Sequence, residues 1–196
     1  MCSITIVTNR HLCREDFLVR IERLAAGGAD RIILREKDLS ADAYRRLAER
    51  VLAVCAPYRT ECILHSFAET DHSKIHLPLS VMRCRVRKNN WQTVGVSVHS
   101  VEEASEAALW GADYLIAGHI FETACKQGAE GRGTDFLKEV CRAVNIPVHA
   151  IGGITEKNVH LLGGTGVAGI CVMSSAMKES APDCLLNSLH EQMILW

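Results

Sequence analysis

Short apolar runs alternate with amphipathic segments along nearly the whole chain. The apolar runs have the length of buried strands, and we expect eight of them, over Ile4 to Thr8, Arg31 to Leu34, Cys62 to His65, Lys74 to Leu77, Thr93 to Val98, Tyr114 to Ala117, Pro147 to Ile151 and Ala168 to Met173. Helices are predicted between most of these runs, over Arg14 to Ala26, Ala41 to Ala56, Val101 to Trp110, Asp135 to Val144, Glu156 to Leu162 and Pro182 to Ile194. The connections flanking the fourth strand are short and less regular. This alternation is typical of a parallel sheet wrapped by helices.

Eight strand-helix units in 196 residues predict an α/β fold, a small single (β/α)₈ TIM barrel. A doubly wound open sheet is the alternative. We expect one domain over residues 1–196, with a lid loop at about residues 118–133 that follows the sixth strand and carries charges between glycines. Because the carboxyl ends of barrel strands converge on one face, candidate site residues are sought at those ends.

Composition and charge narrow the classes of partner. The chain is 48% hydrophobic, and its 22 Lys and Arg nearly balance its 23 Asp and Glu, so we expect no binding to nucleic acid or to a membrane surface. The basic group Arg83, Arg85, Arg87 and Lys88 is interpreted as a solvated helix face. No apolar run has membrane-spanning length, and the start of the chain lacks the features of a signal peptide. The nine cysteines are scattered without a Cys-x-x-Cys pair, which predicts a reducing, cytoplasmic setting and no disulfide framework.

Small residues end the last two predicted strands. Gly152 and Gly153 follow the seventh strand, and Ser174 and Ser175 follow the eighth. Glycines allow a close approach of the backbone to an anion, and amide groups at a helix start stabilise its charge, so these four residues are predicted to bind a phosphate. The alternative is that the glycines only form a tight turn. No glycine motif of the dinucleotide-binding or P-loop type is present.

Several motifs in chain order resemble the thiamine phosphate synthase and TenI family of small (β/α)₈ barrels. They are Leu34 to Asp38, Gly95 to Ala104, Gly111 to Tyr114, the lid from Gly118, Ile146 to Thr155, and Val172 to Ala176. The family has a synthase branch and a branch of TenI-type thiazole tautomerases. The lid of this chain reads Gly-His-Ile-Phe-Glu-Thr-Ala-Cys-Lys from Gly118 to Lys126, and Glu-Gly-Arg-Gly from Glu130 to Gly133. It is similar to the tautomerase lid, whereas synthases resemble Gly-Pro-Ile-Phe-Pro-Thr at this place.

The positions at which synthases of this family bind a metal also favour the tautomerase branch. The resemblance implies that synthases hold Mg²⁺ with an Asn-Asp-Arg after the third strand and a further Asp after the fourth. Here those positions read His65-Ser66-Phe67 and His76-Leu77-Pro78-Leu79-Ser80, and Glu69 and Asp71 lie a few residues further on. Since a hard cation prefers oxygen ligands to imidazole, we expect no metal and no other cofactor, and Mg²⁺ only for a synthase.

The resemblance therefore predicts an isomerase of thiamine biosynthesis, a thiazole tautomerase that converts an exocyclic carboxythiazole phosphate into the aromatic thiazole phosphate. His119 is the expected catalytic residue, because one imidazole can take and return the proton near neutral pH.

Six further residues are expected to bind this substrate. Arg35 and Lys37 would pair with its carboxylate or phosphate, or else form a surface ion pair with Glu36 or Asp38. Ser97 and His99 lie one pleat apart and are expected to face the mouth. Glu122 would orient His119 or hold the lid, and Lys126 would screen the phosphate.

Three other functions stay open at this point. The first is a thiamine phosphate synthase that joins a pyrimidine pyrophosphate to thiazole phosphate with Mg²⁺. The second is a non-catalytic barrel that binds thiazole or thiamine phosphates as a regulator. The third is a zinc hydrolase, suggested by the histidines at or beside strand ends, His65, His76, His99 and His119, but weakened by the lack of a His-x-His pair after the first strand. The sequence leaves a homo-oligomer open.

Overall fold

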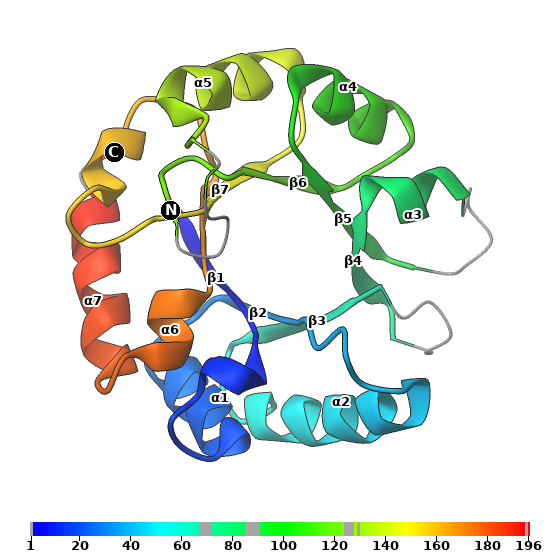
Figure 1. Cartoon of the computed structure of the whole chain (residues 1–196), viewed down its shortest axis with the longest axis vertical. Helices are drawn as coiled ribbons and strands as arrows, with labels where there is room; N and C mark the ends of the chain where they lie inside the picture. The colour runs from blue at the N-terminus through cyan, green and yellow to red at the C-terminus, as the bar shows by residue number, and fades with distance from the viewer. Residues whose placement is uncertain (1, 67–71, 85–90, 124–127, 129, 195) are drawn as a thin grey trace.

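The strands of the computed structural model close into a parallel barrel (Figure 1). The structure describes residues 2–66, 72–84, 91–123, 128, 130–194 and 196. Each strand pairs with the next in sequence and the last pairs with the first, so the order is that of a (β/α)₈ barrel and the open-sheet alternative is excluded. The strands are β1 Ser3–Val7, β2 Arg31–Leu34, β3 Glu61–His65, β4 Lys74–Pro78, β5 Thr93–Val98, β6 Tyr114–Gly118, β7 Val148–Ile151 and β8 Gly169–Val172.

Helices surround the sheet on its outer face (Figure 1). They are α1 Phe17–Ala26, α2 Ala41–Cys55, α3 Leu79–Cys84, α4 Val101–Leu109, α5 Gly133–Ala143, α6 Ser174–Lys178 and α7 Pro182–Met193, with 3-10 turns η1 Arg10–Leu12 and η3 Val159–Leu162. Three of the helices begin at side-chain caps, because Asp16, Ser40 and Ser100 accept hydrogen bonds from amides of the first turn.

One predicted helix is wrong. The segment from Glu156 to Leu162 forms only η3, over its last four residues. The amide of Thr155 donates to the Asn158 carboxamide oxygen, and the Asn158 side chain donates to the Gly153 carbonyl, 2.8 Å in each case. These local bonds hold the segment in a turn and compete with helix formation.

Strand alternation divides the buried side chains into two sets. Residues such as Ile6, Leu34 and Val96 point outward and form the main core against the helices. The alternate residues point into the lumen of the barrel, where Val7, Ile33, Ile63, Tyr114, Ile116 and Cys171 pack together.

The lumen is polar at the end where the strands begin. Glu61, where β3 begins, forms two ion pairs, with Arg31 of β2 at 3.0 Å and with Lys74 of β4 at 2.6 Å.

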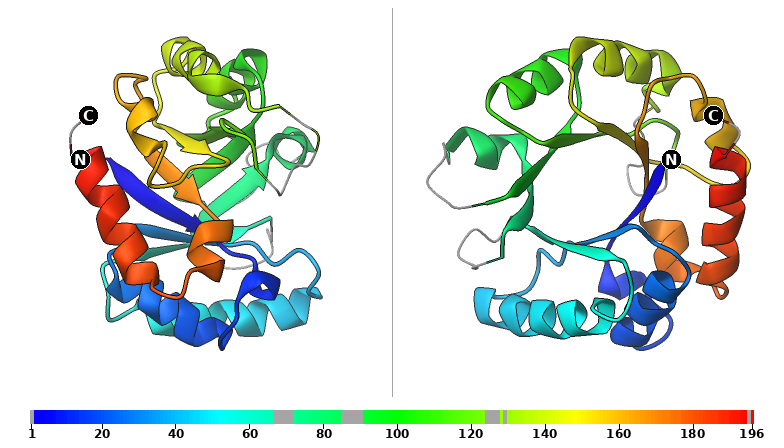
Figure 2. Two further views of the ribbon diagram at one scale, coloured as in Figure 1. Left: turned by 60° about the vertical axis from the view of Figure 1, so that its left-hand side comes forward. Right: turned by 180° about the vertical axis from the view of Figure 1, so that it is seen from behind.

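Both chain ends lie at the end of the barrel where the strands begin, away from their carboxyl ends (Figure 2). Among the described residues, every helix is too short or too polar to cross a lipid bilayer.

The Gly95→Ala change tests how tightly the lumen is packed. A Cβ at Gly95 would lie 2.0 Å from Cζ of Tyr114, so the ring or the strand would have to move. We expect a loss of about 1–3 kcal/mol in the free energy of unfolding, measured by urea denaturation. In a Tyr114→Leu background the same change should cost clearly less, and an equal cost in both backgrounds would show that the ring is not the obstacle.

Acid should destabilise the fold through the lumen histidines. Burial lowers the pKa of His65 to about 3 and that of His149 to about 4, and it lowers the pKa of His76 as well. Below about pH 6.5 these histidines take up protons in the unfolded chain but not in the native one, so the free energy of unfolding falls as the pH drops from 6.5 toward 4, by about 1.4 kcal/mol per pH unit for each residue. Urea unfolding between pH 7 and pH 5 should show a shallower pH slope for His149→Asn than for the exposed control His160→Gln. Parallel slopes would contradict this assignment.

Candidate functional site

Two carboxylates beside the end of β2 are engaged by the β1–α1 connection. Glu36 is buried, with 2% of its surface exposed, and accepts hydrogen bonds from the Thr8 hydroxyl at 2.6 Å and from the Arg10 guanidinium at 3.0 Å. Asp38 forms a two-point ion pair with Arg10 and accepts a further contact from His11 Nε2 at 3.0 Å. The Arg10 guanidinium holds the pKa of the Asp38 carboxyl well below its usual range.

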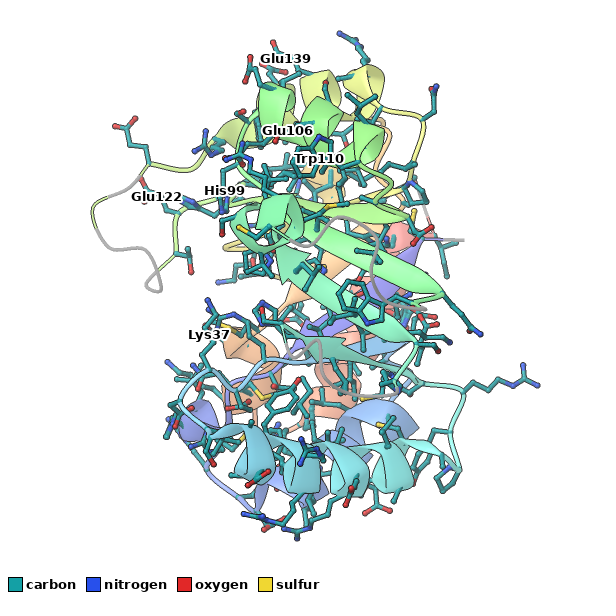
Figure 3. All side chains as sticks on the ribbon, turned by 90° about the vertical axis from the view of Figure 1, so that its right-hand side faces the viewer. Lys37, His99, Glu106, Trp110, Glu122 and Glu139 are labelled. Carbon is teal, nitrogen blue, oxygen red and sulfur yellow. The ribbon has the colours of Figure 1, made fainter. Side chains whose placement is uncertain are left out.

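The same arrangement leaves Arg35 and Lys37 without an acidic partner among the described residues. The predicted alternative, an ion pair of these cations with Glu36 or Asp38, is therefore wrong, because Arg10 and His11 occupy both carboxylates. Partial burial, with the charge of Arg35, lowers the pKa of Lys37. Lys37 lies at the same end of the barrel as His99 and Glu122 (Figure 3).

Histidines lie on the next two strands, at the last residue of β3 and at the middle residue of β4. His65 on β3 and His76 on β4 are paired in register, and their ring centroids lie 6.0 Å apart. His65 Nδ1 contacts the Ser66 hydroxyl at 2.8 Å, and the Tyr44 hydroxyl accepts the amide hydrogen of His65 at 2.9 Å. Ser66 has φ +62°, a conformation uncommon outside glycine. His76 Nε2 lies 2.8 Å from the Ser97 hydroxyl on β5, so neighbouring strands are connected at the mouth.

Ser97 and His99 differ in their surroundings. Ser97 is half-buried and contacts the lumen residue His76. His99 is exposed, and its Nδ1–H donates to the Gly118 carbonyl oxygen at 2.7 Å, which joins the end of β5 to the end of β6. His99 therefore closes the rim of the mouth.

The described part of the lid folds back over the β7 turn. His119 is 7% exposed, and a Cβ at Gly152 would lie 2.3 Å from the His119 Cβ. The amide of Arg132 donates to the His119 carbonyl and that of Gly133 to the Ile120 carbonyl, both at 3.0 Å, so the two ends of the lid are tied together. Glu122 is exposed, and Lys126 lies outside the described residues.

The turns after β7 and β8 lie at the far side of the mouth. Gly152 and Gly153 have φ +105° and +65°, and Cβ atoms there would meet the backbone of the lid. Ser174 and Ser175 open α6, and together with Arg14, Lys178, Glu179 and Ser180 they line a cleft of about 360 Å³. The buried Arg20 of α1 holds α6 in place by donating to the Ala176 carbonyl at 3.2 Å.

The donors present at the mouth do not fit Mg²⁺. The described residues at the implied metal positions, His65-Ser66 and His76 to Ser80, offer imidazoles held neutral by burial, the hydroxyls of Ser66 and Ser80, and no carboxylate. Within the described ranges, no group of three His, Cys, Asp or Glu residues could hold a metal ion. Glu69 and Asp71 lie outside those ranges.

Sequence reasoning missed two features of this region. Tyr114 was expected only as the start of a strand, yet its hydroxyl lies 3.2 Å from His76 Nδ1. This contact depends on the register that places Tyr114 opposite Gly95, which the sequence alone does not display. Arg14 and Lys178 beside the predicted phosphate turn were also missed, and no pattern in the sequence connects them.

Comparisons with known proteins connect the whole chain to one family. Residues 4–176 match the family model described as thiamine monophosphate synthase. Thiamine-phosphate synthase 2 of Streptococcus pneumoniae is 35% identical over 199 residues, which cover 94% of this chain and 94% of the relative. The thiamine-phosphate synthase of Enterococcus faecalis is 36% identical over 185 residues, 89% of this chain and 86% of the relative.

The solved structures agree. Thiamine phosphate pyrophosphorylase from Pyrococcus furiosus superimposes with a TM-score of 0.85 at 26% identity, over 98% of this chain and 96% of that one. The thiamine phosphate pyrophosphorylase structure from Bacteroides thetaiotaomicron, at 23% identity and a TM-score of 0.71, supports the fold.

These matches overturn the predicted isomerase. The tautomerase prediction depended on the lid motif, whereas relatives that match over the full length of the chain are thiamine-phosphate synthases, so the prediction is wrong. The synthase alternative, a transferase, is better supported. With its closed eight-stranded barrel and its match over residues 4–176, the chain belongs to the thiamine monophosphate synthase (TMP-TENI) family.

Proposed function

We propose that the chain is a transferase of the thiamine-phosphate synthase type. It would join a pyrimidine, supplied as its pyrophosphate ester, to a thiazole phosphate and release pyrophosphate. The observation that carries this proposal is the pairing of Glu36 and Asp38 with Arg10 and His11, because it leaves Arg35 and Lys37 at the mouth with charge for an anionic ligand. The full-length similarity to thiamine-phosphate synthases supports it.

The proposed reaction concentrates charge on the leaving group. A carbon–nitrogen bond to the thiazole forms while the carbon–oxygen bond to pyrophosphate breaks, and the electron pair of the broken bond leaves with the oxygen. Arg35, with its planar fork, and Lys37, with its point charge, are proposed to stabilise this oxygen, and the Ser97 hydroxyl is proposed to add a hydrogen bond. The described donors do not fit a carboxylate-held Mg²⁺, so no step of this proposal uses one.

A second anion site is proposed at the other side of the mouth. The thiazole phosphate would lie against the turns of Gly152, Gly153, Ser174 and Ser175, close to the cations Arg14 and Lys178 of the adjoining cleft. His119 would serve there as a packing residue beside Gly152, because its expected acid–base role belonged to the tautomerase reaction. Glu122 and Lys126 stay predicted lid charges, and His99 a predicted rim contact.

One observation favours a second function, a barrel that binds thiazole or thiamine phosphates without transferring the pyrimidine. Neutral imidazoles stand where the resemblance implies metal-binding carboxylates. A binder of this kind would keep both anion sites and would not catalyse the transfer of the pyrimidine.

The cytoplasmic setting and a homo-oligomer stay predictions. Every described cysteine is free.

The transferase proposal predicts product formation in a direct assay. The purified chain is incubated with the pyrimidine pyrophosphate and the thiazole phosphate, in parallel with Mg²⁺ and with a chelator, and thiamine phosphate is measured by chromatography. We expect thiamine phosphate and pyrophosphate in equal amounts. Calorimetric binding of either substrate without any product, in both conditions, would contradict the transferase and favour the binder.

The cation pair predicts which side chains grip pyrophosphate. Arg35→Ala and Lys37→Ala should each weaken binding of inorganic pyrophosphate about tenfold or more, because each removes a charge-assisted hydrogen bond. Arg45→Ala is the matched control, since Arg45 lies exposed on α2 and pairs with Asp42. Titration calorimetry measures the three affinities, and equal affinities would show that the anion does not lie at the end of β2.

A further inference from the structure

We infer that Tyr114 is a positioning residue that fixes the Ser97 hydroxyl as a hydrogen-bond donor toward the mouth, by holding His76 in a single tautomer. The inference rests on the proposed function for the identity of the ligand. It deepens that function by stating what the β5 wall of the mouth selects, namely a ligand atom that accepts a hydrogen bond, such as an oxygen of a phosphate or pyrophosphate.

Both ring nitrogens of His76 are engaged. Nδ1 lies 3.2 Å from the Tyr114 hydroxyl and Nε2 lies 2.8 Å from the Ser97 hydroxyl, while only 2% of the residue is exposed. Burial, with the neighbouring His65, His149 and Arg35, lowers the pKa of His76 well below its ordinary value. The ring is therefore neutral, so one nitrogen donates and the other accepts.

Tyr114 decides which nitrogen accepts. Its hydroxyl is buried in the lumen, where burial raises its pKa and keeps it protonated. Among the described residues, His76 Nδ1 is the acceptor within reach of this hydroxyl, and a buried O–H without an acceptor is unfavourable. Tyr114 therefore donates to Nδ1, and the proton of the imidazole lies on Nε2.

The tautomer of His76 then sets the direction of its hydrogen bond with Ser97. The Nε2–H of His76 donates to the Ser97 oxygen, so the serine acts as acceptor in this contact and its own hydrogen is directed elsewhere. Without Tyr114 the imidazole could carry its proton on Nδ1, and Ser97 would donate to Nε2. A serine that donates to His76 has no hydrogen left for a ligand.

The Tyr114 ring is held on several sides. The side chain fits only because residue 95 is glycine, since a Cβ there would lie 2.3 Å from the tyrosine oxygen. The His149 ring packs edge-on at a centroid distance of 5.7 Å, and the Arg31 guanidinium lies 5.5 Å from the centroid of the Tyr114 ring. A side chain held in this way can keep one orientation of its hydroxyl.

The donor of Ser97 completes one wall of the mouth. Arg35, His65, His76 and Ser97 come from or directly follow β2, β3, β4 and β5, four strands that pair consecutively. An oxyanion placed along this wall would meet the Arg35 charge at one end and the Ser97 hydrogen at the other. An ammonium group would meet a donor and a cation, both unfavourable.

The first measurement needs no ligand, and it uses a variant only to assign the signals. Long-range ¹H–¹⁵N correlation spectra of the labelled wild-type protein report which imidazole nitrogen of His76 is protonated, with His76→Asn used to assign the signals. We expect a protonated Nε2 and an unprotonated Nδ1. A proton on Nδ1 would overturn the inference, whether or not the chain is a transferase.

The second measurement uses inorganic pyrophosphate as the probe, in titration calorimetry of Tyr114→Phe, Ser97→Ala and the double variant. We expect affinity to fall about threefold to tenfold for Tyr114→Phe and about tenfold or more for Ser97→Ala. The double variant should bind no more weakly than Ser97→Ala, because both changes remove the same hydrogen bond. Independent, multiplying losses would overturn the inference.

Two controls separate this role from a structural one. Tyr58→Phe removes the hydroxyl of a tyrosine that contacts Glu22 outside the lumen, and should leave affinity unchanged. Thermal unfolding of each variant shows whether it is folded at the temperature of the titration. If Tyr114→Phe is unfolded there, the wild-type spectrum alone decides the inference. Failure of the wild-type protein to bind pyrophosphate would contradict the proposed function and leave the tautomer result to judge Tyr114.

Discussion

A closed barrel of eight strands places every second side chain in a lumen without room for bulk water, so each polar group there needs a protein partner. Arg31 and Lys74 meet that requirement at the lower end by sharing Glu61. Higher up, Tyr114 and Ser97 meet it through the two nitrogens of His76. The result is a column of polar contacts from the floor to the mouth, and the geometry of the site follows from strand register.

The pattern of ion pairs decides which charged side chains stay unpaired beside β2. Glu36 is buried beneath Thr8 and Arg10, and Asp38 is bound by Arg10 and His11, so both acidic residues near β2 are neutralised by the preceding connection. Neutral imidazoles follow on β3 and β4. The cations Arg35 and Lys37 beside β2 are therefore not opposed by a described carboxylate, and the proposed anion site depends on this.

The elements that sequence reasoning placed well are those governed by local pattern. The bounds of β2 and β5 were predicted to the residue, because their apolar runs end at charged or turn-forming neighbours. The bounds of the short helices α3 and α6 were not predicted, although a helix face at Arg83 and a helix start after the eighth strand were, since five or six residues cannot show a helical period.

The candidate site likewise has residues that the sequence pattern located and contacts that it did not. Strand ends directed attention to Arg35 and Ser97, but the engagement of Glu36 by Arg10 joins residues 26 positions apart. The role of Tyr114 likewise depends on Gly95 in the neighbouring strand and His76 in the one beyond. Such contacts depend on tertiary register, which a single sequence does not display.

The lid motif misled for a physical reason that the structure makes visible. A Cβ at Gly152 would overlap the Cβ of His119 at 2.3 Å, and one at Gly153 would meet the Glu122 carbonyl at 2.4 Å. The lid histidine and the glycine turn are thus two sides of one packing contact. They looked like separate evidence for an acid–base residue over a phosphate site, yet the contact alone accounts for the glycine, and it involves the Cα and Cβ atoms of residue 119 rather than its imidazole. Because packing against the lid already explains the turn glycines, they are not independent evidence for a phosphate beside a catalytic histidine, and similarity along the whole barrel outweighs the lid motif.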